Sequence, residues 1–224
     1  MTKKRATLFE LLTALGLFLV YTVGVMLIDV QAIGPFGSKV GLASVNGFFF
    51  STFGQNEFWY HLTESLGIFA IGLAASYALL FLAQWRKRKK IFLVDRHLWS
   101  FALLVVYVIL AYVFFEVFVV NCRPILDEEG LLEASYPSSH TLIALCIFSY
   151  TFSRVKYYLK DRRALAFCRI VLIVLILLMV VGRLFSGVHW FSDILGSVLL
   201  SNFLFTLNEF SVPLLDRVCE DSRE

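Results

Sequence analysis

The stretch VGRLFSGVHWFSDILGS, residues 181–197, places three ionisable side chains inside a strongly apolar part of the chain. These side chains are Arg183, His189 and Asp193. Charged groups at membrane depth are costly, and where they occur they usually serve a function. The stretch therefore indicates a membrane segment with a candidate functional site at one end.

The composition supports a lipid environment for the whole chain. Of its 224 residues 59% are hydrophobic, and the mean hydropathy is +0.78. A helix needs roughly 20 mostly apolar residues to cross a bilayer. The sequence predicts an all-α bundle of six transmembrane helices in one domain, residues 1–224, with spans near 8–28, 61–84, 97–120, 138–158, 164–183 and 188–210. The first segment lacks a small-residue cleavage pattern, so we expect it to be a permanent span rather than a signal peptide.

The lysine and arginine residues indicate the orientation of these spans. In a six-span chain, 17 of the 20 basic residues fall on one side, in clusters at 3–5, 86–96, 154–169 and 217–223. Basic loops usually stay in the cytoplasm, so both termini are expected there. The clusters account for the net charge of +3 without any nucleic-acid partner. Three basic residues remain on the outer side: Lys39, Arg123 and Arg183.

Polar residues gather at the outer ends of the last four spans. Arg123 is followed by Pro124, which should end the third span. In the segment YPSSHT, residues 136–141, the proline and serines are typical of a helix start, with His140 in the first turn. His189 and Asp193 are four residues apart, so on one helix they would share a face and the carboxylate would orient the imidazole.

These side chains together suit phosphate chemistry. Two arginines and a helix N-terminus bind a tetrahedral oxyanion well. A histidine held by a carboxylate is a competent nucleophile toward phosphorus, and a second histidine can act as acid and then as base. The arginines can supply the positive charge that a metal supplies elsewhere, so no metal or other cofactor is expected. The four cysteines match no zinc pattern and form no disulfide framework.

This set resembles the type-2 phosphatidic acid phosphatase family, which are integral-membrane lipid phosphatases with three sequence motifs. The second motif, Pro-Ser-Gly-His, appears here as residues 137–140 with Ser139 in place of glycine. The third, Ser-Arg-x5-His-x3-Asp, appears as Gly182, Arg183, His189 and Asp193 in register. The first, Lys-x6-Arg-Pro, keeps only Arg123 and Pro124. The resemblance covers about residues 60–205.

The resemblance implies a role for each matching residue. His189 would form a phosphohistidine, Asp193 would orient it, and His140 would protonate the leaving oxygen and then activate water. The phosphoryl oxygens would be held by Arg123, Arg183, Ser138 and the backbone near Ser139.

The largest departure from the family pattern is at Glu116, where the family has lysine. Three interpretations of Glu116 are open: it turns away and pairs with an arginine, it contacts a cationic part of a substrate, or it marks a site with weaker phosphate binding. Lys39, the only outer lysine, is a possible substitute. Glu64 is a second carboxylate at membrane depth, and the sequence names no partner for it.

Three functions follow as hypotheses. The first is a metal-independent phosphatase that acts on a lipid phosphate or diphosphate at the outer face of a bacterial plasma membrane, with undecaprenyl diphosphate as the preferred substrate by analogy and phosphatidylglycerol phosphate as the other bacterial candidate. The second is a lipid phosphotransferase that passes the phosphoryl group to an acceptor alcohol. The third is a non-catalytic binder of lipid phosphates. The sequence does not indicate an oligomeric state.

Overall fold

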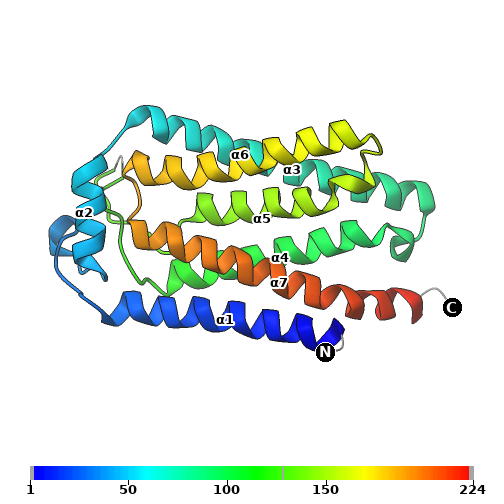
Figure 1. The fold of residues 1–224 in the computed structure, drawn as a ribbon, viewed down its shortest axis with the longest axis horizontal. Coiled ribbons are helices and arrows are strands. Elements are labelled where there is room, and N and C mark those ends of the chain that lie inside the picture. Colours follow the sequence, from blue (N-terminus) through cyan, green and yellow to red (C-terminus); the bar gives the residue numbers. More distant parts are fainter. Residues whose placement is uncertain (1–2, 128, 222–224) are drawn as a thin grey trace.

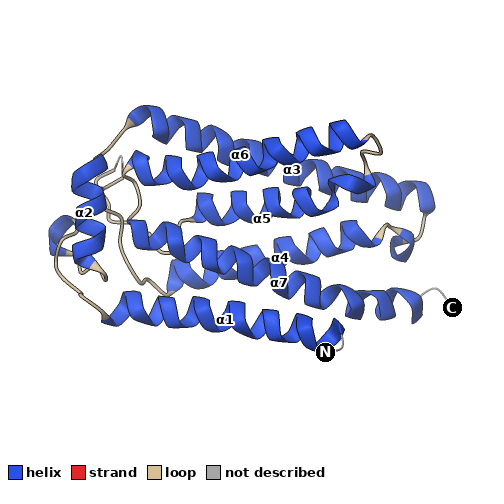
Figure 2. Ribbon diagram, in the orientation of Figure 1, coloured by secondary structure: helices blue, strands red, loops and turns tan. Residues whose placement is uncertain are grey.

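The computed structural model describes the backbone of residues 3–127 and 129–221, and the side chains of residues 7–127 and 129–213. Long helices dominate it, and they lie side by side along one axis (Figure 1). The described residues contain no strand, only two isolated bridges, Gln31 with Val40 and Cys122 with Ala134 (Figure 2). The all-α prediction is confirmed.

Seven α-helices and three short 3-10 turns follow one another along the described chain. The α-helices are α1 (Lys3–Leu27), α2 (Ala43–Phe53), α3 (Glu57–Arg88), α4 (Arg96–Val117), α5 (Ser139–Arg154), α6 (Arg162–Ser186) and α7 (Phe191–Asp221). The 3-10 turns are η1 (Pro35–Gly37), η2 (Ile91–Leu93) and η3 (Val155–Tyr157).

Five of the helices are long and apolar enough to cross a membrane: α1, α3, α4, α6 and α7. The prediction of six spans differs from this result at α5, which has only 16 residues and is about 24 Å long at 1.5 Å per residue. The reason is the position of α5 in the bundle. It packs against α3, α4, α6 and α7, so neighbouring helices rather than lipid surround most of its length.

The outer surface of the long helices is apolar, as a lipid environment requires. Side chains such as Val20, Ile68, Leu110 and Ile170 are exposed on the helices they belong to. The buried core lies where α4, α5 and α7 meet, and it includes Leu104, Leu142, Ala144, Phe148 and Leu204. The protein is a multi-pass membrane protein.

The two ends of the bundle have different chemical character. The turns from α3 to α4 and from α5 to α6 lie at the same end as both chain ends (Figure 1), and the basic clusters are in these segments. Arg223, which belongs to the last basic cluster, lies outside the described residues. At the opposite end lie α2 and the loop between α4 and α5, and there the predicted site residues gather.

Helix α2 was not predicted, because its eleven residues are too few to span a bilayer. It lies across the end of the bundle next to α7 (Figure 1). Asn46 of α2 is fully buried and donates to the Ser192 hydroxyl at 2.9 Å, while its side-chain oxygen accepts from the Ser192 backbone N–H at 3.0 Å. The first loop thereby fixes the start of α7.

Candidate active site

His189 lies in the short loop between α6 and α7, two residues before α7 begins. The expectation that it shares a helix face with Asp193 is therefore wrong, because the chain is not yet helical at His189. The imidazole is almost fully buried, and its Nε2 atom has no hydrogen-bond partner within the described residues. The ring lines a cavity of about 440 Å³, here called the His189 cavity.

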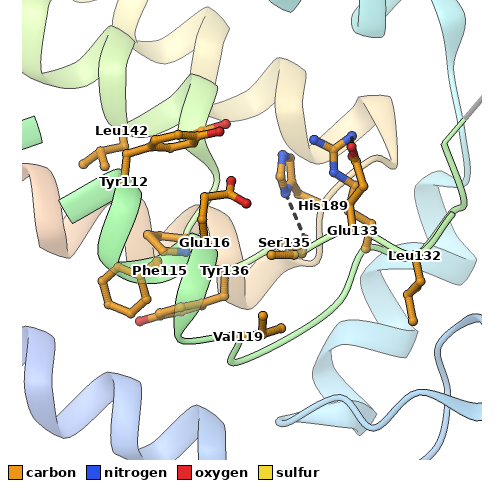
Figure 3. A pocket seen from close by; sticks show the side chains of 14 residues that line it. Tyr112, Phe115, Glu116, Val119, Leu132, Glu133, Ser135, Tyr136, Leu142 and His189 are labelled. Carbon is orange, nitrogen blue, oxygen red and sulfur yellow. Dashed lines mark hydrogen bonds and ion pairs between the residues drawn. The ribbon is translucent and has the colours of Figure 1, made fainter. Parts of the chain in front are cut away.

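Ser135 connects His189 to Asp193. Its hydroxyl donates to Asp193 Oδ2 at 2.5 Å and lies 3.0 Å from His189 Nδ1. Because the hydroxyl has a single proton, it accepts from Nδ1–H in this arrangement. The direct distance from Nδ1 to Asp193 Oδ2 is 4.0 Å, which is too long for a hydrogen bond. The carboxylate thus orients the ring through a serine, and the lone pair of Nε2 points toward the cavity (Figure 3).

Asp193 is completely buried, and its carboxylate accepts three further hydrogen bonds. Asn121 donates to Oδ1 at 3.0 Å, and the backbone N–H of Trp190 donates to Oδ2 at 3.0 Å. The hydroxyl of Ser192 adds a longer contact of 3.3 Å to Oδ1. A carboxylate that accepts several hydrogen bonds keeps a fixed orientation. The network therefore holds the acceptor of the Ser135 bond in place.

The ionisation of His189 suits a nucleophile. Burial holds the pKa of the His189 ring well below its usual range, and the charges of Arg183 and Arg123 and the nearby His140 lower that pKa further. The ring is therefore neutral at pH 7, and Nε2 keeps its lone pair.

His140 occupies the first turn of α5, as predicted, and contacts two charged groups. Its Nδ1 accepts from Arg183 Nη2 at 3.1 Å, so Nε2 carries the proton, and Nε2 is 3.1 Å from Glu64 Oε2. Glu64 also accepts from Arg183 Nη1 at 2.9 Å. Glu64, whose partner the sequence did not name, therefore joins the second histidine to the buried arginine.

Thr63 and Gly182 adapt α3 and α6 to this arrangement. A Cβ atom on Gly182 would lie 2.6 Å from the Thr63 methyl group, so the glycine allows the close approach of the two helices. The Thr63 hydroxyl in turn accepts from Arg183 Nη1 at 3.2 Å. Gly182 stands where the family motif has serine. A hydroxyl from the neighbouring helix α3, that of Thr63, contacts the adjacent Arg183.

Arg123 lies after α4 and forms an ion pair with Glu133, with 2.9 Å between Nη1 and Oε2. Both residues line the His189 cavity and also a second cavity, here called the His140 cavity, which includes Glu64 and His140. The Arg123–Glu133 ion pair therefore borders both the His189 cavity and the His140 cavity.

The two serines of the second motif differ in position. Ser138 is the N-cap residue of α5 and is fully buried, and its hydroxyl accepts from Thr141 at 3.0 Å. It lines neither cavity, whereas Ser139 lines the His189 cavity. The N-terminus of α5 therefore meets the His189 cavity at Ser139 and the His140 cavity at His140.

Glu116 lies in the last turn of α4 and lines the His189 cavity. Its carboxylate is directed into the same space that the His189 ring faces (Figure 3). Among the residues whose side chains are described, Glu116 forms no ion pair with an arginine. Lys39 lines neither cavity. The structure thus favours the interpretations in which Glu116 acts on the contents of the cavity.

Comparisons with known proteins agree with this geometry. The sequence model of the PAP2 superfamily matches residues 116–208. The resemblance to the type-2 phosphatidic acid phosphatases is thereby confirmed, and the match includes all eight site residues that the sequence predicts, from Glu116 to Asp193.

The fold is similar to that of a transmembrane PAP2-type phosphatidylglycerolphosphate phosphatase from Bacillus subtilis. The TM-score is 0.59 at 17% sequence identity, and the alignment covers 90% of this chain and 94% of that chain. No curated protein matches the sequence.

Sequence reasoning missed several contributors to the candidate site. Ser135, Asn121, Asn46 and Thr63 carry no local motif, and they reach the site only through contacts between distant segments. The one available signal was that these serine, threonine and asparagine residues lie within or beside apolar segments. Such residues are too common to identify a site by themselves.

Proposed function

We propose that the protein is a metal-independent membrane phosphatase that hydrolyses a lipid phosphate or diphosphate through a phosphohistidine intermediate. The observation that carries this proposal is the buried, neutral His189 ring, whose Nδ1 is held by Ser135 and whose Nε2 faces a cavity without a partner. A ring fixed in this way has its nucleophilic lone pair at the cavity surface.

The first step is an in-line attack of His189 Nε2 on phosphorus. The P–N bond forms as the P–O bond to the leaving group breaks. His140 takes a second proton from solvent on Nδ1 when the phosphoryl group draws Arg183 away, and it gives that proton to the departing oxygen. In the second step neutral His140 takes a proton from water, whose oxygen attacks phosphorus and displaces His189. Inorganic phosphate leaves, and both histidines return to their starting states.

The two arginines support this reaction by holding the phosphoryl oxygens. Arg123 and Arg183 each contact a carboxylate, Glu133 and Glu64 respectively. A phosphoryl group carries more charge than a carboxylate and offers three oxygens, so it competes for the same guanidinium donors. The proposed reaction needs no metal, because these donors stabilise the charge of the transition state.

A lipid substrate suits the position of the site. The two cavities lie at one end of a bundle with an apolar outer surface, where a headgroup meets the histidines while its chains remain in the membrane. Undecaprenyl diphosphate is our first choice by analogy. Phosphatidylglycerol phosphate is the second, because the solved relative is described as a phosphatase of that lipid.

The test is phosphate release by the purified protein in detergent with excess EDTA. We expect release from at least one of these lipids, and a loss of about 10³-fold or more in kcat for His189→Ala because the nucleophile is removed. His61→Ala is the matched control, since His61 is exposed on α3 and lies outside both cavities. Activity that persists in His189→Ala, or that requires an added divalent metal, contradicts the proposal.

A lipid phosphotransferase is the second candidate, and the position of Glu116 favours it. A carboxylate beside the His189 cavity can accept a hydrogen bond from an alcohol that replaces water in the second step. Product analysis in the presence of candidate acceptor alcohols separates the two functions. Phosphorylated acceptor in place of free phosphate indicates transfer.

A further inference from the structure

The site contains more negative than positive groups. Two guanidinium groups, Arg123 and Arg183, face the carboxylates of Glu133 and Glu64 at 2.9 Å each. Asp193 is buried behind His189 and contacts only neutral donors. Glu116 adds a further carboxylate and has no ion pair among the described side chains. A phosphate dianion that carries no positive group therefore enters a site in which the carboxylates outnumber the guanidinium groups.

Glu116 projects from the wall of the His189 cavity that α4 forms. Tyr112, one helical turn earlier, lines the same wall, and its side chain interacts with the Glu116 carboxylate. Phe115 and Tyr136 also line this cavity, and their buried rings pack on each other. Figure 3 shows the Glu116 carboxylate, the Tyr112 ring and the His189 ring around one space. A carboxylate beside a phenol ring is a favourable surrounding for a cation.

An independent feature indicates that a ligand occupies this space. The Nε2 atom of His189 belongs to a side chain that is 96% buried, and it has no hydrogen-bond partner in the described part of the chain although it faces the cavity. Buried polar atoms are rarely left without a partner. One cavity therefore presents a buried nitrogen without a partner and an exposed carboxylate without an ion pair among the described side chains.

We propose that Glu116 and Tyr112 bind an ammonium group that is part of the same molecule as the phosphate. The ligand class is then an amine-bearing phosphate ester, in which the phosphorus meets His189 and the ammonium meets Glu116. The family has a lysine where this chain has Glu116, so the charge that position 116 presents to the ligand is negative instead of positive. An ammonium group on the ligand again gives an attractive contact between opposite charges. The assignment of the phosphorus to His189 rests on the proposed function.

The test compares matched ligands that differ only in the amine. Binding of 2-aminoethyl, 3-aminopropyl and 4-aminobutyl phosphate is measured by calorimetry at pH 7 against ethyl, propyl and butyl phosphate, with the full chain in detergent. For at least one chain length we expect the amine to tighten binding about three- to fivefold in the wild type, as for a partly exposed ion pair. The ratio of the affinity for the aminoalkyl phosphate to the affinity for the matching alkyl phosphate should fall to about one in Glu116→Gln. In Glu116→Lys this ratio should fall below one.

Two controls exclude simpler explanations. Glu10→Gln removes an exposed carboxylate from α1, and it should keep the wild-type affinity ratio, since Glu10 lines neither cavity. A mixture of ethyl phosphate and ethylamine should bind no better than ethyl phosphate alone. If the mixture matches the aminoalkyl phosphate, or if Glu116→Gln keeps the wild-type ratio, the proposal is overturned.

Phosphate release from the same ligands separates this proposal from the proposed function. A preference for the amine in binding, together with no release from any phosphate ester or lipid, supports the ammonium subsite and contradicts the phosphatase. Release without any preference that depends on Glu116 supports the phosphatase and overturns the subsite.

Discussion

At the scale of single residues, the histidines of the site are held by groups far away in the sequence. His140 contacts Glu64, 76 positions earlier, and His189 contacts Ser135, 54 positions earlier. Ser135 occupies Nδ1 of His189 and leaves Nε2 without a partner. Both nitrogens of His140 are engaged, Nδ1 by Arg183 and Nε2 by Glu64.

Glu64 should act as a positioning residue for the acid step. Its carboxylate favours the protonated form of His140, which gives a proton to the leaving oxygen. We expect Glu64→Gln to lower kcat for lipid phosphates by about 10- to 100-fold. p-Nitrophenyl phosphate should be affected far less, because its leaving group departs without protonation.

The comparison of leaving groups separates positioning from a structural role. A loss of fold or of phosphate binding would reduce turnover of both substrates equally, and such a result would contradict the assignment. Glu10→Gln again serves as the carboxylate control and should leave both rates unchanged, because Glu10 lines neither cavity.

At the scale of helices, the site depends on the close approach of α3 to α5 and α6. Gly67 of α3 faces His140 of α5, and a Cβ atom at Gly67 would lie 2.8 Å from His140 Cδ2. The side chain of Arg183 on α6 reaches the same ring at 3.1 Å. The small residue therefore leaves room for the imidazole between the two helices.

Gly67→Ala should reduce activity without loss of stability. The added methyl group moves the imidazole away from its contacts, and misplacement of a catalytic group by about 1 Å costs about 100-fold in rate. Gly72→Ala on the same helix is the matched control, because nothing lies within 4 Å of a Cβ atom there. Both substitutions gain the same helix propensity, about 1 kcal/mol. Equal rates for the two variants in a phosphate-release assay would show that α3 does not constrain the ring.

The elements differ in how far the sequence predicts them. The long spans follow from apolar length, and the register of Arg183, His189 and Asp193 follows from their spacing. Helix α2 and the loop that carries Ser135 have neither apolar length nor a motif, because tertiary contacts hold them: Asn46 to Ser192, and Ser135 to Asp193. The direct bond from Asp193 to His189 was predicted from helical geometry that begins only at Phe191.

At the scale of the whole molecule, the basic clusters and the site lie at opposite ends of the bundle. The turns rich in lysine and arginine lie at the end that carries both chain ends (Figure 1). The loop between α4 and α5, at the other end, lines both cavities. Basic loops stay in the cytoplasm in most membrane proteins. We therefore propose that the site opens to the outside, where it meets lipids of the outer leaflet.

Cysteine labelling tests this orientation in intact bacterial cells that express the protein. Starting from a variant without the four native cysteines, Val30→Cys places a thiol in an exposed position at the site end, and Tyr157→Cys places one at the basic end. A thiol reagent that cannot cross membranes should label position 30 in intact cells and position 157 only after the cells are opened, because the bilayer separates the two ends. Labelling of position 157 in intact cells, with position 30 protected until lysis, would place the site in the cytoplasm. The chemistry of His189 would then serve the inner leaflet.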